Sequence, residues 1–458
     1  MERMAKTLSE QTVDFIHGLS GPYLENSYIP SELYHKYQVK RGLRNEDNTG
    51  VMAGLTRIGN VRGYYIQDGE RMPTQGQLIY RGIDVEDLIQ GCSSENRFGF
   101  EETCYLLLMG SLPNRTQLEH FQQALEEMRT LPPMFTEDTI LKGPSSNVMN
   151  KLARSILALY SYDEDPESMT VENQLRLSMQ LIARTPVIVA HAYAAKRRYF
   201  DHESLYLHLP KAGQGTAETF LSVVRQDQQF TDDEAKLLDL CLMLHAEHGG
   251  GNNSTFTCRV ISSSYTDMFS SIAAAVGSLK GPRHGGANIR CKQMMDYIAG
   301  EVHDWKDDEE ICRCLVRLLK KEGFDHSGLI YGMGHAVYTL SDPRAEVLRH
   351  FSRNLAIKKG MEDRLDLIES VERLTPSVFA YVTGKDKVMC ANVDLYSGFV
   401  YEMLNIPEEL YTPLFATARM VGWCAHRLEE IFNPSRIIRP AYKAISPTSP
   451  FIPLDDRG

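Results

Sequence analysis

The chain has 458 residues, of which 43% are hydrophobic and 24% are charged; a chain of this length can bury a substantial core without disulfides or metal ions, and it allows two or three domains. It carries 49 Lys and Arg against 60 Asp and Glu, a net charge of -11, which argues against the extended basic face that nucleic acids and anionic membranes bind. An anionic small substrate would therefore need a local cluster of cations.

Apolar residues recur with helical spacing along most of the chain. After the first 50 residues, which are polar and which we expect to form an irregular surface arm, residues 117–128 place their apolar side chains on one helix face. A capping box at 231–234 predicts the start of another helix. Further helices are expected over 100–109, 148–159, 174–182, 270–279, 310–321, 364–374 and 414–430. Residues 76–81 are the best candidate strand, in a short hairpin, and the tail from Pro440 should lack regular structure, so the sequence predicts an all-α fold.

The nine cysteines are scattered and include no Cys-x-x-Cys pair. Such usage is typical of a reducing compartment and argues against a structural zinc finger. The N-terminal residues contain acids and lack an apolar stretch, so we expect neither a secretory signal nor a transit peptide. The most apolar segments, 186–195 and 272–279, are too short to span a bilayer. These features predict a soluble, cytoplasmic protein.

Three short segments combine glycine and histidine with an acid or an amide, and the first of them covers residues 244–254. An apolar helix runs into His245 and His248, followed by three glycines that permit left-handed backbone and the close approach of a ligand. A helix C-cap with a histidine at the negative end of the helix dipole is the alternative. The two histidines could share a metal, but no carboxylate lies at the spacing that metalloproteases use.

The second segment, residues 281–288, presents His284 among small residues directly after an apolar helix. A histidine in this setting is less easily buried in a core than one inside a helix. A helix that begins just after it would favour a neutral imidazole, which can donate a hydrogen bond. A tight turn between two helices is the alternative.

The third segment, residues 332–344, places His335 after two glycines and Arg344 nine residues later, beyond an Asp-Pro turn. It is not a dinucleotide-binding fingerprint, because the third glycine and a preceding strand are missing. Arginine can fork onto a carboxylate while histidine polarises a carbonyl, so the pair suits a carbonyl next to a carboxylate. An ordinary glycine-rich loop is the alternative.

The third segment resembles the signature of the citrate synthase family, Gly-x-Gly-His-x-Val-x₄-Asp-Pro-Arg. Residues 76–88, 100–113 and 392–398 resemble other segments of that family and occur in its order. The resemblance covers the chain except for about the first 45 residues, and the combination is specific where each piece alone is not. It implies an all-α, two-domain homodimer with the active site in the interdomain cleft. The large domain would comprise 1–285 and 401–458, and the small domain 286–400.

The resemblance also implies the chemistry, the condensation of acetyl-CoA with oxaloacetate to citrate and free CoA through an enol(ate) and citryl-CoA. Asp394 would remove a proton from the thioester methyl group. His284 would donate a hydrogen bond to the thioester carbonyl, and His335 would polarise the ketone and protonate the new alkoxide. A carboxylate alone cannot remove so weakly acidic a proton, and a donor placed at the developing enolate lowers the barrier. Taken alone, Asp394 could be a surface acid in a turn.

Five further positions match residues that bind substrate in the family. His248, Asn252 and Arg344 are expected to hold oxaloacetate. Arg419 and Arg439 would bind its carboxylates, the second of them by reaching the active site of the neighbouring subunit. Lysine could not replace these arginines equally, because guanidinium supplies bidentate geometry. Taken alone, both would be ordinary surface charges. The resemblance implies no cofactor, acetyl-CoA being a substrate, and no metal.

One position departs from the family pattern. Some members carry an arginine shortly after the catalytic histidine that helps to hold the CoA phosphates, whereas this chain has Thr339. Candidates for that contact are four cations near the motifs: Lys280, Arg283, Lys385 and Lys387. The NADH-inhibited branch of the family has a distinctive N-terminal region, and the N-terminal arm of this chain does not decide whether NADH regulates it.

Other functions fit parts of the sequence. A 2-methylcitrate synthase would use propionyl-CoA through the same residues, and the motifs do not separate the two, because a pocket distinguishes one methylene by only about 1–3 kcal/mol. A metal-dependent hydrolase built on His245, His248 and His284 is a remoter alternative. A non-catalytic helical scaffold is also conceivable, but it would not need three histidines flanked by glycines together with Asp394 and Arg344.

Overall fold

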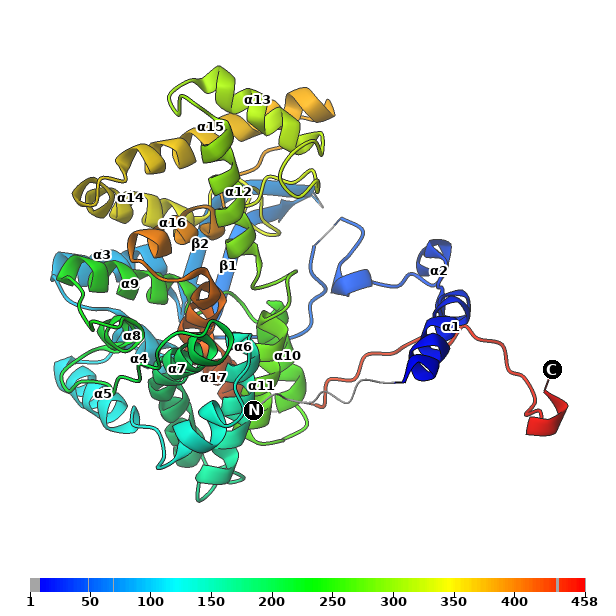
Figure 1. The fold of residues 1–458 in the computed structure, drawn as a ribbon, viewed down its shortest axis with the longest axis horizontal. Helices are drawn as coiled ribbons and strands as arrows, with labels where there is room; N and C mark the ends of the chain where they lie inside the picture. The colour runs from blue at the N-terminus through cyan, green and yellow to red at the C-terminus, as the bar shows by residue number, and fades with distance from the viewer. Residues whose placement is uncertain (1–8, 48, 69, 434–435, 458) are drawn as a thin grey trace. The chain divides into compact units, whose positions relative to one another are not determined.

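The computed structural model describes residues 9–47, 49–68, 70–433 and 436–457, which belong to two units (Figure 1). The terminal unit comprises Met1–Gly54 and Arg439–Gly458, and the body comprises Leu55–Ile438. All the predicted site residues except Arg439 fall in the body. The division into domains over 286–400 and the flanking segments stays a prediction.

The terminal unit contains more helix than the sequence led us to expect. It holds α1 (Glu10–Ser27), α2 (Ser31–Lys36) and two short 3-10 turns, η1 (Arg41–Leu43) and η5 (Leu454–Asp456). The prediction of an irregular arm is therefore wrong for this part of the chain. The helix α1 begins at an N-cap, Ser9, whose hydroxyl accepts the N–H of Thr12. After Pro440 the only regular element among the described residues is η5, in line with the prediction for the tail.

The body is helical apart from one small antiparallel sheet in the order β1–β2–β3. Its strands are β1 (Gly59–Gln67), β2 (Glu70–Tyr80) and β3 (Ile83–Asp84). Its α-helices are α3 (Val85–Ser94), α4 (Phe100–Met109), α5 (Arg115–Met128), α6 (Val148–Leu159), α7 (Val171–Phe200), α8 (Thr216–Val224), α9 (Asp232–His245), α10 (Asn253–Ser262), α11 (Met268–Leu279), α12 (Ala287–Glu301), α13 (Asp308–Leu319), α14 (Pro343–Lys358), α15 (Glu362–Thr383), α16 (Val393–Met403) and α17 (Tyr411–Phe432). Shorter helical turns are η2 (Thr136–Leu141), η3 (Tyr160–Tyr162) and η4 (Glu408–Leu410).

The all-α class is confirmed, with the small sheet as the exception. Each helix expected from periodicity overlaps a helix of the structure, and the capping box at Thr231 and Glu234 opens α9 as expected. The segment expected over 174–182 is part of the 30-residue α7, which continues through Pro186. A proline removes one backbone hydrogen bond there, but most of this helix is buried and its packing maintains it.

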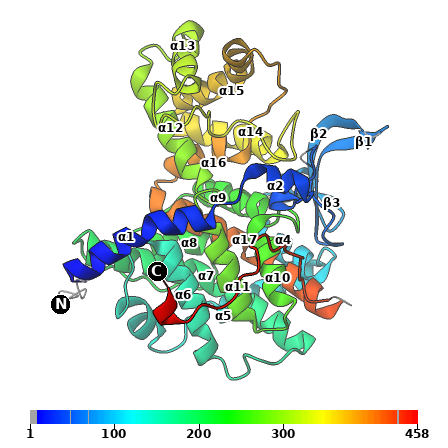
Figure 2. The same ribbon diagram turned by 90° about the vertical axis from the view of Figure 1, so that its right-hand side faces the viewer.

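The core of the body centres on α17, which is buried along nearly all of its length. It packs against α7, α9, α10 and α11, and of these α7, α10 and α11 lie in the lower part of the body in Figure 1. The helices α12 to α16 pack on one another at the other end, as Figure 2 also shows. No helix in the described ranges combines the length and the apolarity needed to cross a membrane.

Candidate active site

The loops that carry His335 and Asp394 are joined by backbone hydrogen bonds. Asn392 donates through its backbone N–H to the carbonyl of Gly332 at 2.8 Å and through Nδ2 to the carbonyl of Gly334 at 2.9 Å. The same amide group accepts the N–H of Asp394 at Oδ1, at 3.0 Å, and so caps α16. Two segments that are about 60 residues apart are thereby held side by side.

His335 is held as a neutral imidazole with its proton on Nε2. The backbone N–H groups of Val337 and Tyr338 both donate to Nδ1 at 3.1 Å. Because an amide N–H can only donate, Nδ1 must be the acceptor. The ring stacks on that of Tyr338, with centroids 4.7 Å apart. The loop thus fixes both the orientation of the ring and the nitrogen that can donate to a ligand.

His248 lies against the rings of His335 and Tyr338, with centroid distances of 5.3 and 5.7 Å. Removal from water lowers the pKa of His248 well below its ordinary value, and the charges of Arg344 and Arg419 lower it further. The imidazole is therefore neutral near pH 7. Its Nε2 is buried, and no residue in the described ranges forms a hydrogen bond with it.

Arg344 and Asp394 are connected through Asp342. Asp342 accepts from Arg344 in a bidentate arrangement, at 3.0 Å from Nε and 2.8 Å from Nη2. Its Oδ2 also accepts the N–H of Val393 at 3.3 Å, which ties the start of α14 to the start of α16. Burial raises the pKa of Asp394 to about 6, with the Arg344 charge opposing the rise and Asp342 adding to it. Asp394 is thus a stronger base than an ordinary carboxylate.

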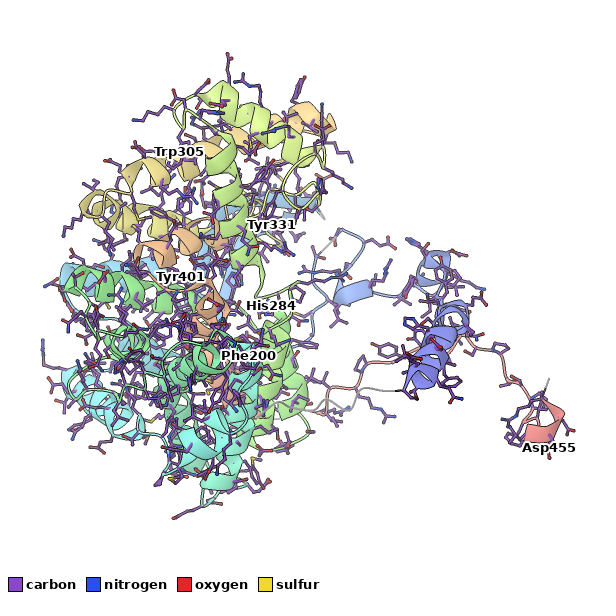
Figure 3. The ribbon with its side chains drawn as sticks, viewed as in Figure 1. Phe200, His284, Trp305, Tyr331, Tyr401 and Asp455 are labelled. Atoms are coloured by element: carbon purple, nitrogen blue, oxygen red, sulfur yellow. The ribbon has the colours of Figure 1, made fainter. Side chains whose placement is uncertain are left out.

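His284 lies on the connection between α11 and α12 (Figure 3), and α12 begins shortly after it, as expected. Its Nε2 is 3.0 Å from Oγ of Ser254. That hydroxyl also accepts Nε1–H of Trp423 at 3.2 Å and donates to Oδ1 of Asn252 at 2.9 Å. Burial and the Arg419 charge lower the pKa of His284 to about 4. The ring is therefore neutral near pH 7 and can donate a hydrogen bond.

Arg419 is fully buried in α17, so it is not the surface charge that the sequence alone left open. Its Nε donates to the carbonyl of His245 at 2.7 Å. Its Nη1 and Nη2 are also buried, and neither has a hydrogen-bond partner within the described part of the chain. Burial lowers the pKa of Arg419 to about 10, against the effect of nearby Glu247, so the group stays charged near pH 7. Buried N–H groups without partners are rare, so these two nitrogens are available to a ligand or to ordered water.

Seven of the eight predicted site residues thus form one connected cluster in the body: His248, Asn252, His284, His335, Arg344, Asp394 and Arg419. Arg439 is exposed and belongs to the terminal unit, and its contribution to a neighbouring subunit stays a prediction. The cations considered for the CoA phosphates are all exposed, namely Lys280, Arg283, Lys385 and Lys387.

The β1–β2 hairpin packs against the loop that precedes α14. Thr339 donates through Oγ1 to the carbonyl of Gly63 at 2.8 Å, and the N–H of Gly76 donates to Oγ of Ser341 at 3.0 Å. A Cβ on Gly63 would lie 2.5 Å from the carbonyl oxygen of Val337, so only glycine permits this approach. The threonine that departs from the family pattern therefore joins this loop to β1.

Sequence reasoning missed the residues that orient the cluster. Tyr338 and Asp342 stand inside the segment 332–344, and Ser254 stands inside 244–254, so the motifs contained them. Nothing in the spacing indicated which way their side chains turn. Within the residues that the structure describes, no group of three or more His, Cys, Asp or Glu is placed to hold a metal ion, and nothing supports the metal-dependent hydrolase.

Comparison with known proteins identifies the family. The family described as "Citrate synthase, C-terminal domain" matches residues 47–441. The chain belongs to the citrate synthase family. Citrate synthase 2 of Bacillus subtilis is 35% identical over 384 residues, which cover 83% of this chain and 93% of that protein. The 2-methylcitrate synthase of Shewanella oneidensis is 32% identical over 383 residues, with coverage of 83% and 92%.

Solved structures of the citrate synthase family share the fold. The structure of the ternary complex of carboxymethyl coenzyme A and oxaloacetate with citrate synthase from Thermoplasma acidophilum matches with a TM-score of 0.74 and 25% identity, covering 92% of this chain and 99% of that one. Citrate synthase from Pyrobaculum aerophilum matches with a TM-score of 0.72 and 29% identity, covering 88% and 93%. As a family member this chain is an enzyme, an acyltransferase that forms a carbon–carbon bond.

Proposed function

We propose that this chain condenses acetyl-CoA with oxaloacetate and releases citrate and free CoA. The observation that carries the proposal is the cluster in which Asp394, with its raised pKa, is joined to His335 by the paired loops and to Arg344 through Asp342. Family membership and the related ternary complex with oxaloacetate support it. The cluster supplies a base, three neutral imidazoles and two buried guanidinium groups.

Oxaloacetate would be held by charge and by hydrogen bonds. The two terminal nitrogens of Arg419, which have no partner among the described residues, supply the fork that a carboxylate accepts. Arg344 lies near the same point, its orientation fixed by Asp342. His335 would donate Nε2–H to the ketone oxygen, with His248 and Asn252 beside it. Each donor is thus placed before the substrate arrives, which lowers the cost of ordering the site.

The thioester would be activated by Asp394 and His284 acting together. Asp394 removes a proton from the methyl group, and the electron pair of the broken C–H bond moves toward the thioester carbonyl. His284, kept neutral by its surroundings, stabilises the enol(ate) by a hydrogen bond to that oxygen. A carboxyl pKa of about 6 suits a base that must be ionised near pH 7 and yet accept a proton readily.

The new bond would form between the methyl carbon and the ketone carbon of oxaloacetate. The ketone oxygen takes the developing negative charge and receives the Nε2 proton of His335, giving citryl-CoA and an imidazolate that the N–H groups of Val337 and Tyr338 would stabilise at Nδ1. The proton that Asp394 took from the methyl group would then restore the neutral imidazole and the ionised carboxylate. Water then cleaves the thioester, and citrate and free CoA leave. Closure of the small domain over the cleft would exclude water until condensation is complete.

We further propose a homodimer in which Arg439 supplies a third guanidinium to the neighbouring active site, as the family resemblance implies. A third guanidinium would add to the charge that Arg344 and Arg419 provide for a dicarboxylate. The nine cysteines are free thiols, which supports a reducing compartment such as the cytoplasm.

The second candidate is 2-methylcitrate synthase, because relatives of both names match at similar identity. Purified protein should be assayed for oxaloacetate-dependent release of free CoA from acetyl-CoA and from propionyl-CoA. We expect kcat/KM to be higher for acetyl-CoA. A higher value for propionyl-CoA would favour the second candidate, and no release from either thioester would refute both.

Asp394→Ala tests the assignment of the base. General base catalysis contributes about 10²–10⁴ in rate, so we expect turnover to fall by at least about a hundredfold while oxaloacetate still binds. Isothermal calorimetry measures the binding independently of turnover. Near-normal turnover in this variant would show that another group removes the proton.

A further inference from the structure

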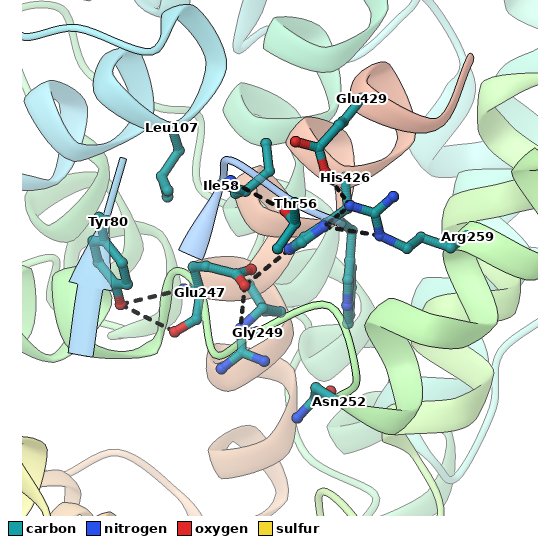
Figure 4. Close-up of polar contacts among 12 residues, drawn as sticks. Thr56, Ile58, Tyr80, Leu107, Glu247, Gly249, Asn252, Arg259, His426 and Glu429 are labelled. Carbon is teal, nitrogen blue, oxygen red and sulfur yellow. Dashed lines mark hydrogen bonds and ion pairs between the residues drawn. The ribbon is translucent and has the colours of Figure 1, made fainter. Parts of the chain in front are cut away.

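We propose that Glu247, His426 and Arg259 form a positioning network that sets the place of His248 for oxaloacetate; this inference rests on the proposed function. Arg259 and His426 lie outside the sequence segments that predicted the site residues. Glu247 lies inside the segment 244–254, where the sequence assigned it no role. All three lie in the body, on the turn between α9 and α10, on α10 and on α17 (Figure 4).

Glu247 closes the turn that presents His248. The side chain is fully buried, and its Oε1 accepts the N–H of Gly249, two residues further along the chain. The same oxygen accepts Nε2–H of His426 at 2.9 Å. The carboxylate therefore holds the backbone directly after His248 and joins it to α17. Gly249 has a φ of +83°, which this turn requires.

His426 is oriented by Arg259. The Nε and Nη2 atoms of Arg259 lie 3.1 and 2.6 Å from Nδ1 of His426. A guanidinium group can only donate, so Nδ1 accepts and the ring proton is on Nε2, directed at Glu247. Arg259 is itself held by Glu430, at 2.8 Å from Nη1, and by Glu429. Glu429 and Glu430 thus hold Arg259 in place, and Arg259 in turn determines which nitrogen of His426 donates to Glu247.

The protein is shaped to admit the Glu247 side chain at this point. A Cβ on Gly59 would lie 2.8 Å from Cγ of Glu247, and a Cβ on Gly422 would lie 2.7 Å from its Oε2. The hydroxyl of Tyr80 accepts the N–H of Glu247 at 3.3 Å. Elements β1, β2 and α17 therefore hold the residue from different sides, and a small displacement of the carboxylate is sterically resisted.

Stability alone does not explain a carboxylate here. Burial opposes ionisation of Glu247, but the hydrogen bond from His426 and the charge of Arg419 keep the pKa of its carboxyl below the usual value. Its Oε2 has no hydrogen-bond partner in the described part of the chain, and such a buried oxygen costs free energy. Glu247 also offsets the charge of Arg419, whose terminal nitrogens are available to a ligand. The carboxylate thus acts on two groups assigned to oxaloacetate.

The test compares two replacements of His426 that differ in hydrogen bonding. His426→Gln keeps an acceptor for Arg259 and a donor for Glu247, whereas His426→Phe keeps a flat ring and neither group. His191→Phe is the matched control: His191 is a buried histidine of α7 that contacts Oγ1 of Thr136 at 2.9 Å and the carbonyl of His208 at 3.2 Å. The helix α7 carries none of the predicted site residues.

We expect His426→Phe to raise the KM and the calorimetric Kd for oxaloacetate by at least about tenfold, as loss of a buried, charge-assisted hydrogen bond would. The KM for the thioester should stay within about twofold, because the proposal confines the effect to oxaloacetate. General damage to the fold would instead change the KM values for oxaloacetate and for the thioester alike. His426→Gln should restore the oxaloacetate KM to within about threefold of that of the unmodified enzyme. His191→Phe should lower the unfolding midpoint and change neither KM.

The proposal is overturned if His426→Phe leaves the oxaloacetate KM unchanged, or if Gln and Phe at this position behave alike. Should His426→Phe not fold, Arg259→Met removes the outer donor and is expected to raise the oxaloacetate KM in the same way; an unchanged value there overturns the proposal equally. Failure of the proposed function is distinguished by the unmodified enzyme, which would then release no CoA.

Discussion

We expect Asp394 to set the pH dependence of the reaction below neutrality. Burial raises its pKa from 3.8 to about 6, with Asp342 adding to the rise and Arg344 opposing it. Only the ionised carboxylate can accept the methyl proton, so kcat/KM must fall as the pH drops through this value. The ionised fraction is about 0.9 at pH 7 and about 0.1 at pH 5, which predicts about a tenfold loss of kcat/KM between them. A carboxyl titrating at its ordinary value would lose less than about a tenth over the same interval.

Two imidazoles of the cluster, those of His284 and His248, do not titrate in this interval. The pKa of His284 is lowered to about 4 and that of His248 lies well below its usual value, both chiefly by burial. Their protonation therefore cannot produce a midpoint near pH 6. A midpoint near pH 6 in the profile of kcat/KM would therefore belong to Asp394 and not to His284 or His248.

The assay follows the loss of thioester absorbance at saturating oxaloacetate, because reagents that detect free thiols respond to pH themselves. The acyl-CoA concentration is varied at each pH to obtain kcat/KM, and Asp394→Asn measured in parallel gives the background. A flat profile between pH 5 and pH 7 would refute the reasoning. So would a limb with the same midpoint in the residual activity of Asp394→Asn, since that limb would belong to another group.

Three further predictions follow from the same contacts. Arg419→Lys should raise the KM for oxaloacetate by at least about tenfold in steady-state kinetics, because an ammonium group cannot form the bidentate pair; an unchanged KM would contradict its role as an anchor. Ser254→Ala should lower kcat by about tenfold, because His284 loses the hydroxyl that orients it, and equal kcat values would show that the contact is dispensable. Gly332→Ala should lower the free energy of unfolding in urea by about 2–4 kcal/mol, because its φ is +83° and a Cβ would lie 2.7 Å from a neighbouring sulfur. Gly360→Ala, with a φ of +68° and open space, should cost about 1 kcal/mol, and equal costs would show that the close contact does not matter.

The fold was predictable where helices are amphipathic or uniformly apolar. The first helix, α1, was not predicted because it contains Gly18, Gly21 and Pro22, which are typical of loops, although Ser9 and Glu10 are helix-start signals. The helix α14 was not predicted because an Asp-Pro pair such as Asp342 and Pro343 is typical of a turn, whereas an N-cap acid followed by proline is also the start of a helix. The sequence contains helix-start signals for both α1 and α14, but the same residue types also occur in loops and turns. Tertiary packing decides between a helix and a turn.

The site was predictable from residue types, and its geometry was not. The motifs contained His335 and Arg344, but the tautomer of His335 depends on two backbone amides whose directions follow from the loop conformation. The pairing of segment 332–334 with segment 390–392 joins distant parts of the chain, which spacing alone does not reveal. Burial of Arg419 had a signal, because the flanking residues of α17 are apolar on every face.

The fate of the methyl protons of acetyl-CoA tests the central claim most directly. Enzyme, oxaloacetate and acetyl-CoA carrying a fully deuterated methyl group are mixed, and the products are analysed by mass spectrometry. The account predicts citrate with two deuterium atoms in its new methylene group, one equivalent of free CoA, and no product from Asp394→Ala beyond background. Release of CoA with acetate instead of citrate, at a rate independent of oxaloacetate, would identify a thioesterase and contradict the account.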